Sequence, residues 1–151
     1  IQNHDQIANS GLGERVHMMA SAARVRALTA VLLLGPQLPM LFMGQEFGAT
    51  APFRYFADHG AELARLVDEG RRNEMGQFPS LALDEMRAHL SRPDVRETFE
   101  GCRLDWGERE RHVPWVALHR DLIRLRLGEP CFLDARRWQL DGAVLGPDAF
   151  V

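Results

Sequence analysis

The sequence predicts an α/β fold, and three stretches of the chain carry that prediction. A run of good helix formers covers residues 21–34 and ends at Gly35-Pro36. A short, almost continuous apolar run follows at 38–43, a pattern typical of a strand that is buried on both faces. Because the chain also starts on an apolar residue, residues 1–2 are consistent with the tail of an earlier strand. Strand, helix and strand would then form one βαβ unit of a parallel sheet.

The helix at residues 21–34 has a clear beginning and end. Ser21 can accept a hydrogen bond from the free amides of the first turn, and Gly35-Pro36 cannot continue the helix. Apolar side chains surround most of the helix near its C-terminal end, namely Val25, Ala27, Leu28, Val31, Leu32 and Leu34. We therefore expect a core helix that packs under other layers.

Loops and helices alternate after the predicted strand. An aromatic loop lies between Gly48 and Gly60, where Pro52 and the flanking glycines argue against a helix. Leucines at helical spacing predict an amphipathic helix from residue 61 to about residue 77. Residues 83–90 are expected to add a short helix.

The second half of the chain predicts a long helix followed by strands. The charged, irregular segment 94–111 is expected to cross the surface without regular elements. Pro114 is well placed at a first helical position, and Gly128-Glu129-Pro130 ends the helix that it opens. Short apolar runs then predict strands, with Asp141-Gly142 as a tight hairpin turn, at residues 132–133, 137–140 and 143–145.

Composition excludes several classes of protein. The net charge of −3 comes from 18 basic and 21 acidic residues spread along the chain, so we expect no nucleic-acid partner and no membrane surface. The longest apolar stretch, residues 28–34, is far shorter than the roughly 18 residues of a spanning helix. Cys102 and Cys131 lack the spacing of a metal site or a disulfide scaffold, which predicts free thiols in a reducing compartment. We expect a cytoplasmic protein. The histidines show no metal-ligand spacing, so no cofactor is expected.

The chemistry-bearing residues stand at the start of the chain, where Asn3, His4 and Asp5 follow the predicted strand tail. The C-terminal mouth of a parallel strand is where α/β barrels place catalytic groups. Asp5 could accept hydrogen bonds from hydroxyl groups and stabilise a developing cation, while His4 and Asn3 offer contacts to the same ring. These residues suit a polyol substrate, although a turn or capping role remains open from the residues alone.

Several blocks of sequence resemble one known family. Residues 1–9, Ile-Gln-Asn-His-Asp-Gln-Ile-Ala-Asn, resemble the seventh-strand motif of the α-amylase superfamily, whose retaining α-glucoside hydrolases and transglycosylases are built on a (β/α)8 barrel. Residues 32–46 resemble the stretch from the next helix to the eighth strand. Four further segments resemble one branch of this superfamily, the maltooligosyltrehalose trehalohydrolases. These segments are residues 52–59, 69–72, 98–100 and 104–106.

The resemblance implies a domain division. Residues 1–128 would be the C-terminal part of the catalytic barrel, from the end of strand 7 through helix 8, and would be rich in helix. Residues 129–151 would begin a truncated C-terminal β domain.

The resemblance also implies roles for the first residues. Asp5 would be the third catalytic carboxylate, which distorts the sugar and stabilises the oxocarbenium-like transition state. His4 would hydrogen-bond the same sugar, and Asn3 and Gln6 would support it. The nucleophile and the general acid would come from the fourth and fifth strands, neither of which is in this chain.

Several other residues could serve either the site or the fold. Phe53, Tyr55 and Phe56 could stack on the glucose or trehalose-like end of the substrate, with packing under the loop as the alternative for each ring. Glu46 either shapes the site or caps the next turn. The pair Arg71-Arg72 is most simply solvated or a local ion-pair donor.

The implied parent is a retaining glycoside hydrolase. It would cleave the α-1,4 bond next to the terminal trehalose unit of maltooligosyl trehalose, or of a related α-glucan, and release trehalose. With one of three essential carboxylates, the chain alone is expected to be inactive. The alternatives are a branching or debranching enzyme of the same superfamily and a non-catalytic helical interaction module. Such a module would self-associate through the exposed barrel edge at 38–43 and the apolar face of helix 21–34.

Overall fold

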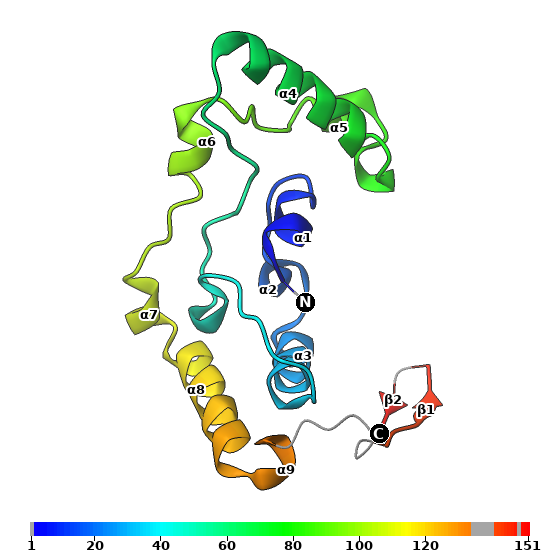
Figure 1. Cartoon of the computed structure of the whole chain (residues 1–151), viewed down its shortest axis with the longest axis vertical. Coiled ribbons are helices and arrows are strands. Elements are labelled where there is room, and N and C mark those ends of the chain that lie inside the picture. The colour runs from blue at the N-terminus through cyan, green and yellow to red at the C-terminus, as the bar shows by residue number, and fades with distance from the viewer. Residues whose placement is uncertain (1, 134–140, 148) are drawn as a thin grey trace.

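The computed structural model describes residues 2–133, 141–147 and 149–151. Figure 1 shows α1, α2 and α3 as an inner column, α6, α7 and α8 as an outer column, and an extended segment of chain between them. In chain order the helices are α1 His4–Ala8, α2 Val16–Met19, α3 Ala22–Leu34, η1 Gln45–Phe47, α4 Ala61–Met75, η2 Pro79–Leu81, α5 Asp84–Arg87, α6 Arg96–Glu100, α7 Glu108–Arg111, α8 Val113–Gly128 and α9 Pro130–Leu133. The strands are β1 Val144–Gly146 and β2 Ala149–Phe150.

Helix α3 confirms the predicted helix and its two ends. Ser21 Oγ accepts a hydrogen bond from the Arg24 amide at 3.4 Å, and the helix stops before Gly35. Its burial differs from the prediction, because Leu28 is 52% exposed and Val31 is 47% exposed. Helix α8 packs against α3, and the opposite apolar face of α3 stays open. The expectation of a helix covered on most sides was therefore wrong.

The predicted strand at 38–43 is not formed. This segment is extended but pairs with no strand of the described residues, and Leu38 is 92% exposed. A parallel strand exists only where neighbouring strands accept and donate its backbone hydrogen bonds. The strands that the structure describes, β1 and β2, pair antiparallel with each other, with Val144 opposite Phe150. The βαβ unit is thus absent from the described part of the chain, and residue 1 lies outside it.

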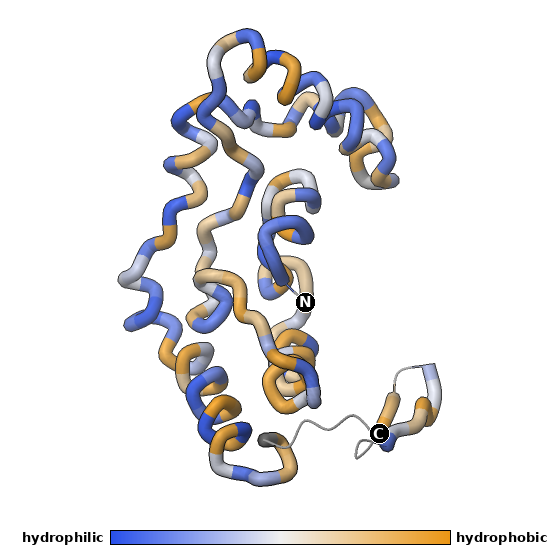
Figure 2. The backbone as a smooth tube through the Cα atoms, in the orientation of Figure 1, coloured by the Kyte–Doolittle hydropathy of each residue, from blue (hydrophilic) through white to orange (hydrophobic). Residues whose placement is uncertain are grey.

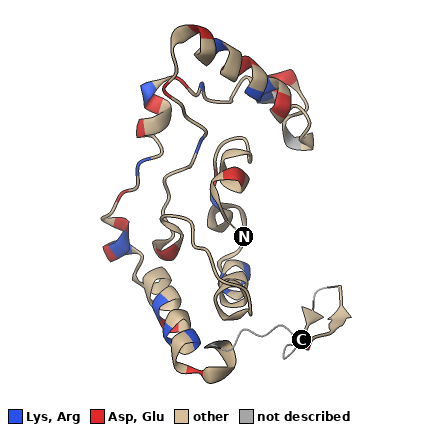
Figure 3. Ribbon diagram, in the orientation of Figure 1, with Lys and Arg blue, Asp and Glu red and all other residues tan. Residues whose placement is uncertain are grey.

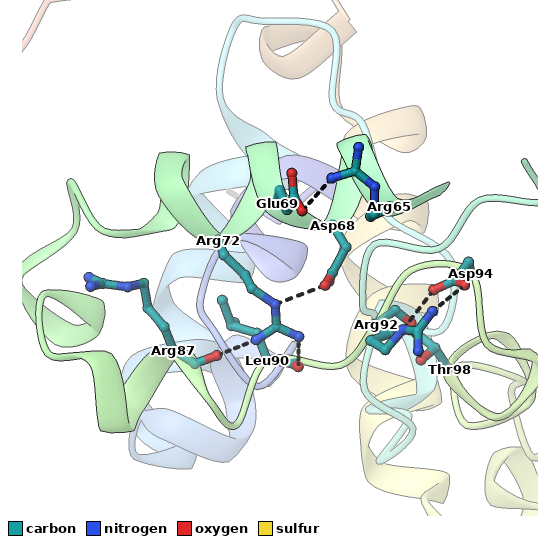
Figure 4. A network of polar contacts seen from close by, with 9 residues as sticks. All are labelled: Arg65, Asp68, Glu69, Arg72, Arg87, Leu90, Arg92, Asp94 and Thr98. Atoms are coloured by element: carbon teal, nitrogen blue, oxygen red, sulfur yellow. Dashed lines mark hydrogen bonds and ion pairs between the residues drawn. The ribbon is translucent and has the colours of Figure 1, made fainter. Parts of the chain in front are cut away.

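Helix α4 confirms the amphipathic helix predicted from residue 61, and α5 falls inside the expected 83–90 range. Met75, Leu81 and Leu90 form a small core beside these helices. Arg72 of α4 donates to Asp68 at 3.0 Å and to the carbonyls of Arg87 at 2.8 Å and Leu90 at 3.3 Å (Figure 4). Because these bonds satisfy one backbone carbonyl at the last residue of α5 and one just after it, they fix α5 against α4.

Two short helices, α6 and α7, lie in the segment that was predicted to be irregular. They are too short to show a hydrophobic period, so the sequence pattern could not reveal them. Helix α8 confirms the last long helix, with Pro114 in its first turn.

The predicted strand at 132–133 is wrong, because α9 Pro130–Leu133 occupies it. Pro130 is the first residue of α9, where proline is favoured because its fixed φ suits a helix and its missing amide is not needed. The predicted run at 137–140 lies outside the described residues. Strand β1 overlaps the predicted run at 143–145.

The chain exposes more surface than a compact protein of its size. Its accessible surface is 10419 Å² for 17.1 kDa. A compact monomer of this mass exposes about 7,800 Å². Figure 2 shows the apolar residues of the extended segment after α3, where Leu38 and Met40 are exposed. This apolar surface has no covering element among the described residues.

Charges are mixed along the outer helices. Figure 3 shows basic and acidic residues interspersed on α4, α6, α7 and α8. None of the helices in the described ranges is both long and apolar enough to cross a membrane.

Arg126 of α8 joins the two columns at the end of α3. Its Nη1 donates to the carbonyls of Leu33 and Gly35, each at 2.8 Å, and its Nη2 donates to the Gln37 carbonyl at 3.2 Å. The last carbonyls of a helix have no partner within it, so Arg126 supplies the cap that α3 lacks.

We predict that Arg126→Met lowers the free energy of unfolding by about 2 kcal/mol, because charged hydrogen bonds to three carbonyls are lost. Arg124→Met is the matched control, since Arg124 lies on the same helix with a side chain that is 74% exposed. Urea denaturation of both variants measures the difference. Equal losses in the two variants would contradict this role of Arg126.

Candidate functional site

Helix α1 carries the residues predicted to contact a sugar. Asn3 is its N-cap, and Asn3 Oδ1 accepts the Gln6 amide at 2.9 Å. His4 Nε2 lies 3.3 Å from Asp5 Oδ1, and both side chains are 67% exposed. Ile7 is 2% exposed and anchors the helix from its inner side. The capping role therefore falls on Asn3, while His4 and Asp5 face solvent beside the exposed Gln6.

Two of the three loop aromatics lie in a row of packed rings. Phe53 meets Phe42 edge to face with 5.0 Å between ring centroids, and Phe56 meets Phe99 in the same way at 5.2 Å. Phe53 and Phe56 also contact each other at 5.8 Å. These contacts favour the packing role for both rings.

The aromatic loop is joined to the loop that follows α1. The Phe53 amide donates to the Gly13 carbonyl at 2.8 Å. Gly13 has a φ of +75°, and a Cβ there would lie 2.6 Å from the Phe53 carbonyl oxygen. Only glycine fits this close approach with that backbone conformation.

Tyr55 stands apart from the packed row. Tyr55 is 39% exposed, and the guanidinium of Arg71 lies 4.9 Å from the centroid of its ring. Arg71 Nη2 donates to the Ala8 carbonyl at 2.7 Å, and Nη1 donates to Asn9 Oδ1 at 3.2 Å. Arg71 thus brings Tyr55 next to the end of α1.

The expectation of a solvated or ion-paired Arg71 was wrong, because its partners are a ring, a backbone carbonyl and an amide oxygen. Burial lowers the pKa of Arg71 below its usual value, and the charge of Glu74 opposes that shift. Its contacts to Ala8 and Asn9 span more than 60 positions of sequence, so no local pattern could have predicted them.

Arg15 is a buried charge that the sequence did not reveal. Its side chain is 0% exposed, its Nε donates to the Ala51 carbonyl at 2.6 Å, and its Nη1 donates to the Met43 carbonyl at 2.9 Å. Burial lowers the pKa of Arg15, and the charges of Glu46 and Glu108 oppose that shift. Glu46, in the first turn of η1, thereby acts on Arg15 through its charge.

Glu108 and His112 hold the loop around η1 from the outer column. Glu108 is 4% exposed, and it accepts hydrogen bonds from the Thr50 hydroxyl and, at 3.1 Å, from the Thr50 amide. His112 Nδ1 lies 3.0 Å from the Phe47 carbonyl oxygen and donates to it in the appropriate tautomer. The two residues were not among the predicted site residues, because a buried glutamate has no sequence signature.

Two pockets of the described residues are lined by residues outside α1. One of 610 Å³ is lined by residues that include Phe56, Asp58 and Phe99, and a second of 310 Å³ shares Phe56 and Phe99 with it. His4 and Asp5 line neither pocket, so the described residues place them on an open surface. Within the described ranges, no three His, Cys, Asp or Glu side chains gather as metal ligands would. Cys102 and Cys131 are free, as expected.

Comparisons with known proteins add to this geometry. No family model matches the chain. Over 96% of its length the chain is 40% identical to a malto-oligosyltrehalose trehalohydrolase of Deinococcus radiodurans, of which it spans 24%. It is 45% identical to the enzyme of that name from Saccharolobus solfataricus, over 83% of the chain and 20% of the relative. A candidate α-amylase from Salmonella typhimurium, solved at 1.4 Å, matches with a TM-score of 0.76 at 37% identity, over 89% of this chain and 22% of that one.

The chain is therefore similar to proteins of the α-amylase superfamily of glycoside hydrolases, as its motifs predicted. Within that superfamily its sequence is similar to the malto-oligosyltrehalose trehalohydrolases, and this predicted resemblance is confirmed over nearly the whole chain. The chain spans about a quarter of the length of the first of these relatives.

His17 generates a prediction about pH. Burial is the main cause that lowers the pKa of His17. The positive charge of Arg15 lowers it further, and His112 adds a smaller effect in the same direction. The unfolded chain therefore binds a proton near pH 6.5 that the folded chain does not, so stability falls as the pH drops below about 6.5. Thermal unfolding followed between pH 5 and 8 should show this loss.

His17→Phe should reduce the pH dependence, because it removes the titrating group and keeps a ring beside Trp115, whose centroid is 5.9 Å from that of His17. The matched control is His59→Phe, since His59 is exposed. An unchanged pH dependence in the His17 variant would show that other groups cause it.

Proposed function

We propose that this chain forms the Asp5-bearing part of a retaining glycoside hydrolase that releases trehalose from maltooligosyl trehalose. The observation that carries the proposal is the similarity of 96% of the chain to a malto-oligosyltrehalose trehalohydrolase, together with a solvent-facing His4-Asp5 pair on α1. Residues 1–128 would belong to the catalytic barrel, and residues 129–151 would begin the β domain that follows it.

Asp5 would act by charge and hydrogen bonding, without forming a covalent bond. In retaining enzymes one carboxylate attacks the anomeric carbon and a carboxylic acid protonates the leaving oxygen, after which water hydrolyses the glycosyl-enzyme. Asp5 would accept hydrogen bonds from the ring hydroxyls and stabilise the positive charge that develops on the sugar in the transition state of each step. His4, which lies 3.3 Å from Asp5, would donate to the same sugar.

Substrate contacts would extend from α1 to the aromatic loop. Tyr55 is the best placed of the three predicted rings, because it is exposed and its Arg71 partner also bonds the end of α1. A ring at this position offers a flat apolar face to the C–H face of a glucose unit. Phe53 and Phe56 would support the loop from behind, and Asn3 and Gln6 would support His4 and Asp5.

We predict that Asp5→Asn in the full-length enzyme lowers kcat for trehalose release by about a hundredfold or more, since a preorganised electrostatic contact to the transition state is lost. Glu14→Gln is the matched control, because Glu14 is an exposed carboxylate outside α1. Enzymatic assay of the released trehalose measures both. A kcat equal to that of the unmodified enzyme would exclude the assigned role of Asp5.

A separate prediction concerns the chain by itself. The purified 151-residue chain should release no trehalose, because the nucleophile and the general acid are expected on other strands. Incubation with maltooligosyl trehalose and assay for trehalose tests this, and measurable release would refute it. Product analysis of the full-length enzyme tests the alternative. If the products are branched or linear glucans and contain no trehalose, the branching or debranching alternative is favoured.

A further inference from the structure

Arg71 is the residue through which α4 holds the proposed sugar site. Its Nη2 donates to the Ala8 carbonyl at 2.7 Å and its Nη1 to Asn9 Oδ1 at 3.2 Å. Both acceptors lie at the C-terminal end of α1, where helix carbonyls have no partner within the helix. Arg71 thus ties the end of α1 to α4 across a sequence separation of 62 to 63 positions.

The same guanidinium also holds Tyr55. It lies 4.9 Å from the ring centroid, so one planar group donates to α1 and covers the Tyr55 ring. An arginine can do both at once, because its donors point outward in the plane while its face stacks on an aromatic ring. A lysine ammonium at the same position has no such plane and could not keep all three contacts.

The position of Asp5 follows from that of Asn9. The Asn9 amide donates to the Asp5 carbonyl at 3.0 Å, and Ile7 between them is buried at 2% exposure. Any movement of the Ala8-Asn9 end is therefore transmitted to Asp5. A displacement of about 1 Å at a reacting centre can lower a rate about a hundredfold.

We propose that Arg71 is a positioning residue that keeps Asp5 and Tyr55 at a fixed separation across the sugar site, without contacting the substrate. This inference rests on the proposed function. It assigns Arg71 a role beyond fold stability, because the two groups that it joins are the predicted transition-state stabiliser and a predicted sugar platform.

The first test uses the 151-residue chain, in which Tyr55 is the single tyrosine. Its ring resonances are therefore assigned without ambiguity, and NMR should show contacts between the Tyr55 ring and the Arg71 side chain. In Arg71→Met the Tyr55 resonances should move. The backbone amide of Asn9 should exchange with solvent about tenfold faster, since the partly buried charged hydrogen bonds that hold this end of α1 are lost. Arg65→Met should change neither, because Arg65 makes an exposed ion pair with Glu69 on the same helix.

The second test uses the full-length enzyme. Arg71→Lys and Arg71→Ala should lower kcat for trehalose release by about tenfold to a hundredfold, with a smaller change in KM, when each variant is assayed at a temperature well below its own Tm. Millimolar guanidinium should restore part of the activity of Arg71→Ala, a rescue that a purely structural role would not give. Arg65→Lys should behave as the unmodified enzyme.

The outcomes separate the two proposals. Unchanged kcat in both Arg71 variants of an enzyme that releases trehalose would overturn the positioning role. Unchanged Tyr55 resonances in Arg71→Met would overturn the contact itself. Failure of the unmodified full-length enzyme to release trehalose would overturn the proposed function and the catalytic part of this inference, while the NMR result would still decide whether Arg71 joins α1 to Tyr55.

Discussion

The buried guanidinium of Arg15 is the contact on which the relation between the inner and outer helices depends. A buried charge costs several kcal/mol unless hydrogen bonds and opposite charges compensate it. The Met43 and Ala51 carbonyls accept from Arg15, which fixes the path of the chain on both sides of η1. Glu108 and His112 of the outer column bond this same loop. One buried side chain thereby determines where the loop presents its backbone to the outer column.

The spacing of apolar residues and the residues that start or stop a helix sufficed to predict α3, α4 and α8. A long helix makes its backbone hydrogen bonds within itself, so its sequence alone carries the signal. The strand at 38–43 could not be judged in this way, since its hydrogen bonds must come from other segments. The same reason limits the site prediction. Asn3 to Gln6 form a contiguous motif, so the sequence alone could name them as candidates, whereas Arg71 reaches α1 across a long stretch of chain and left no local signal.

The excess surface and the apolar segment after α3 have a common explanation in the proposed fold. A strand in the interior of a (β/α)8 barrel is covered by side chains on one face and by helices on the other. Residues 38–43 have the composition for such a place, yet Leu38 and Met40 are exposed in the described part of the chain. In the proposed parent enzyme, the partners that cover this segment would be other parts of such a barrel.

The close approach between Gly13 and Phe53 affects more of the structure than the turn in which Gly13 lies. A Cβ at this position would lie 2.6 Å from the Phe53 carbonyl oxygen, so no other residue fits without parting the two loops. These loops lead to α1 on one side and to Tyr55 on the other. A mutation that replaces Gly13 with a larger residue would therefore disturb the proposed sugar site from a position that is not proposed to contact the sugar.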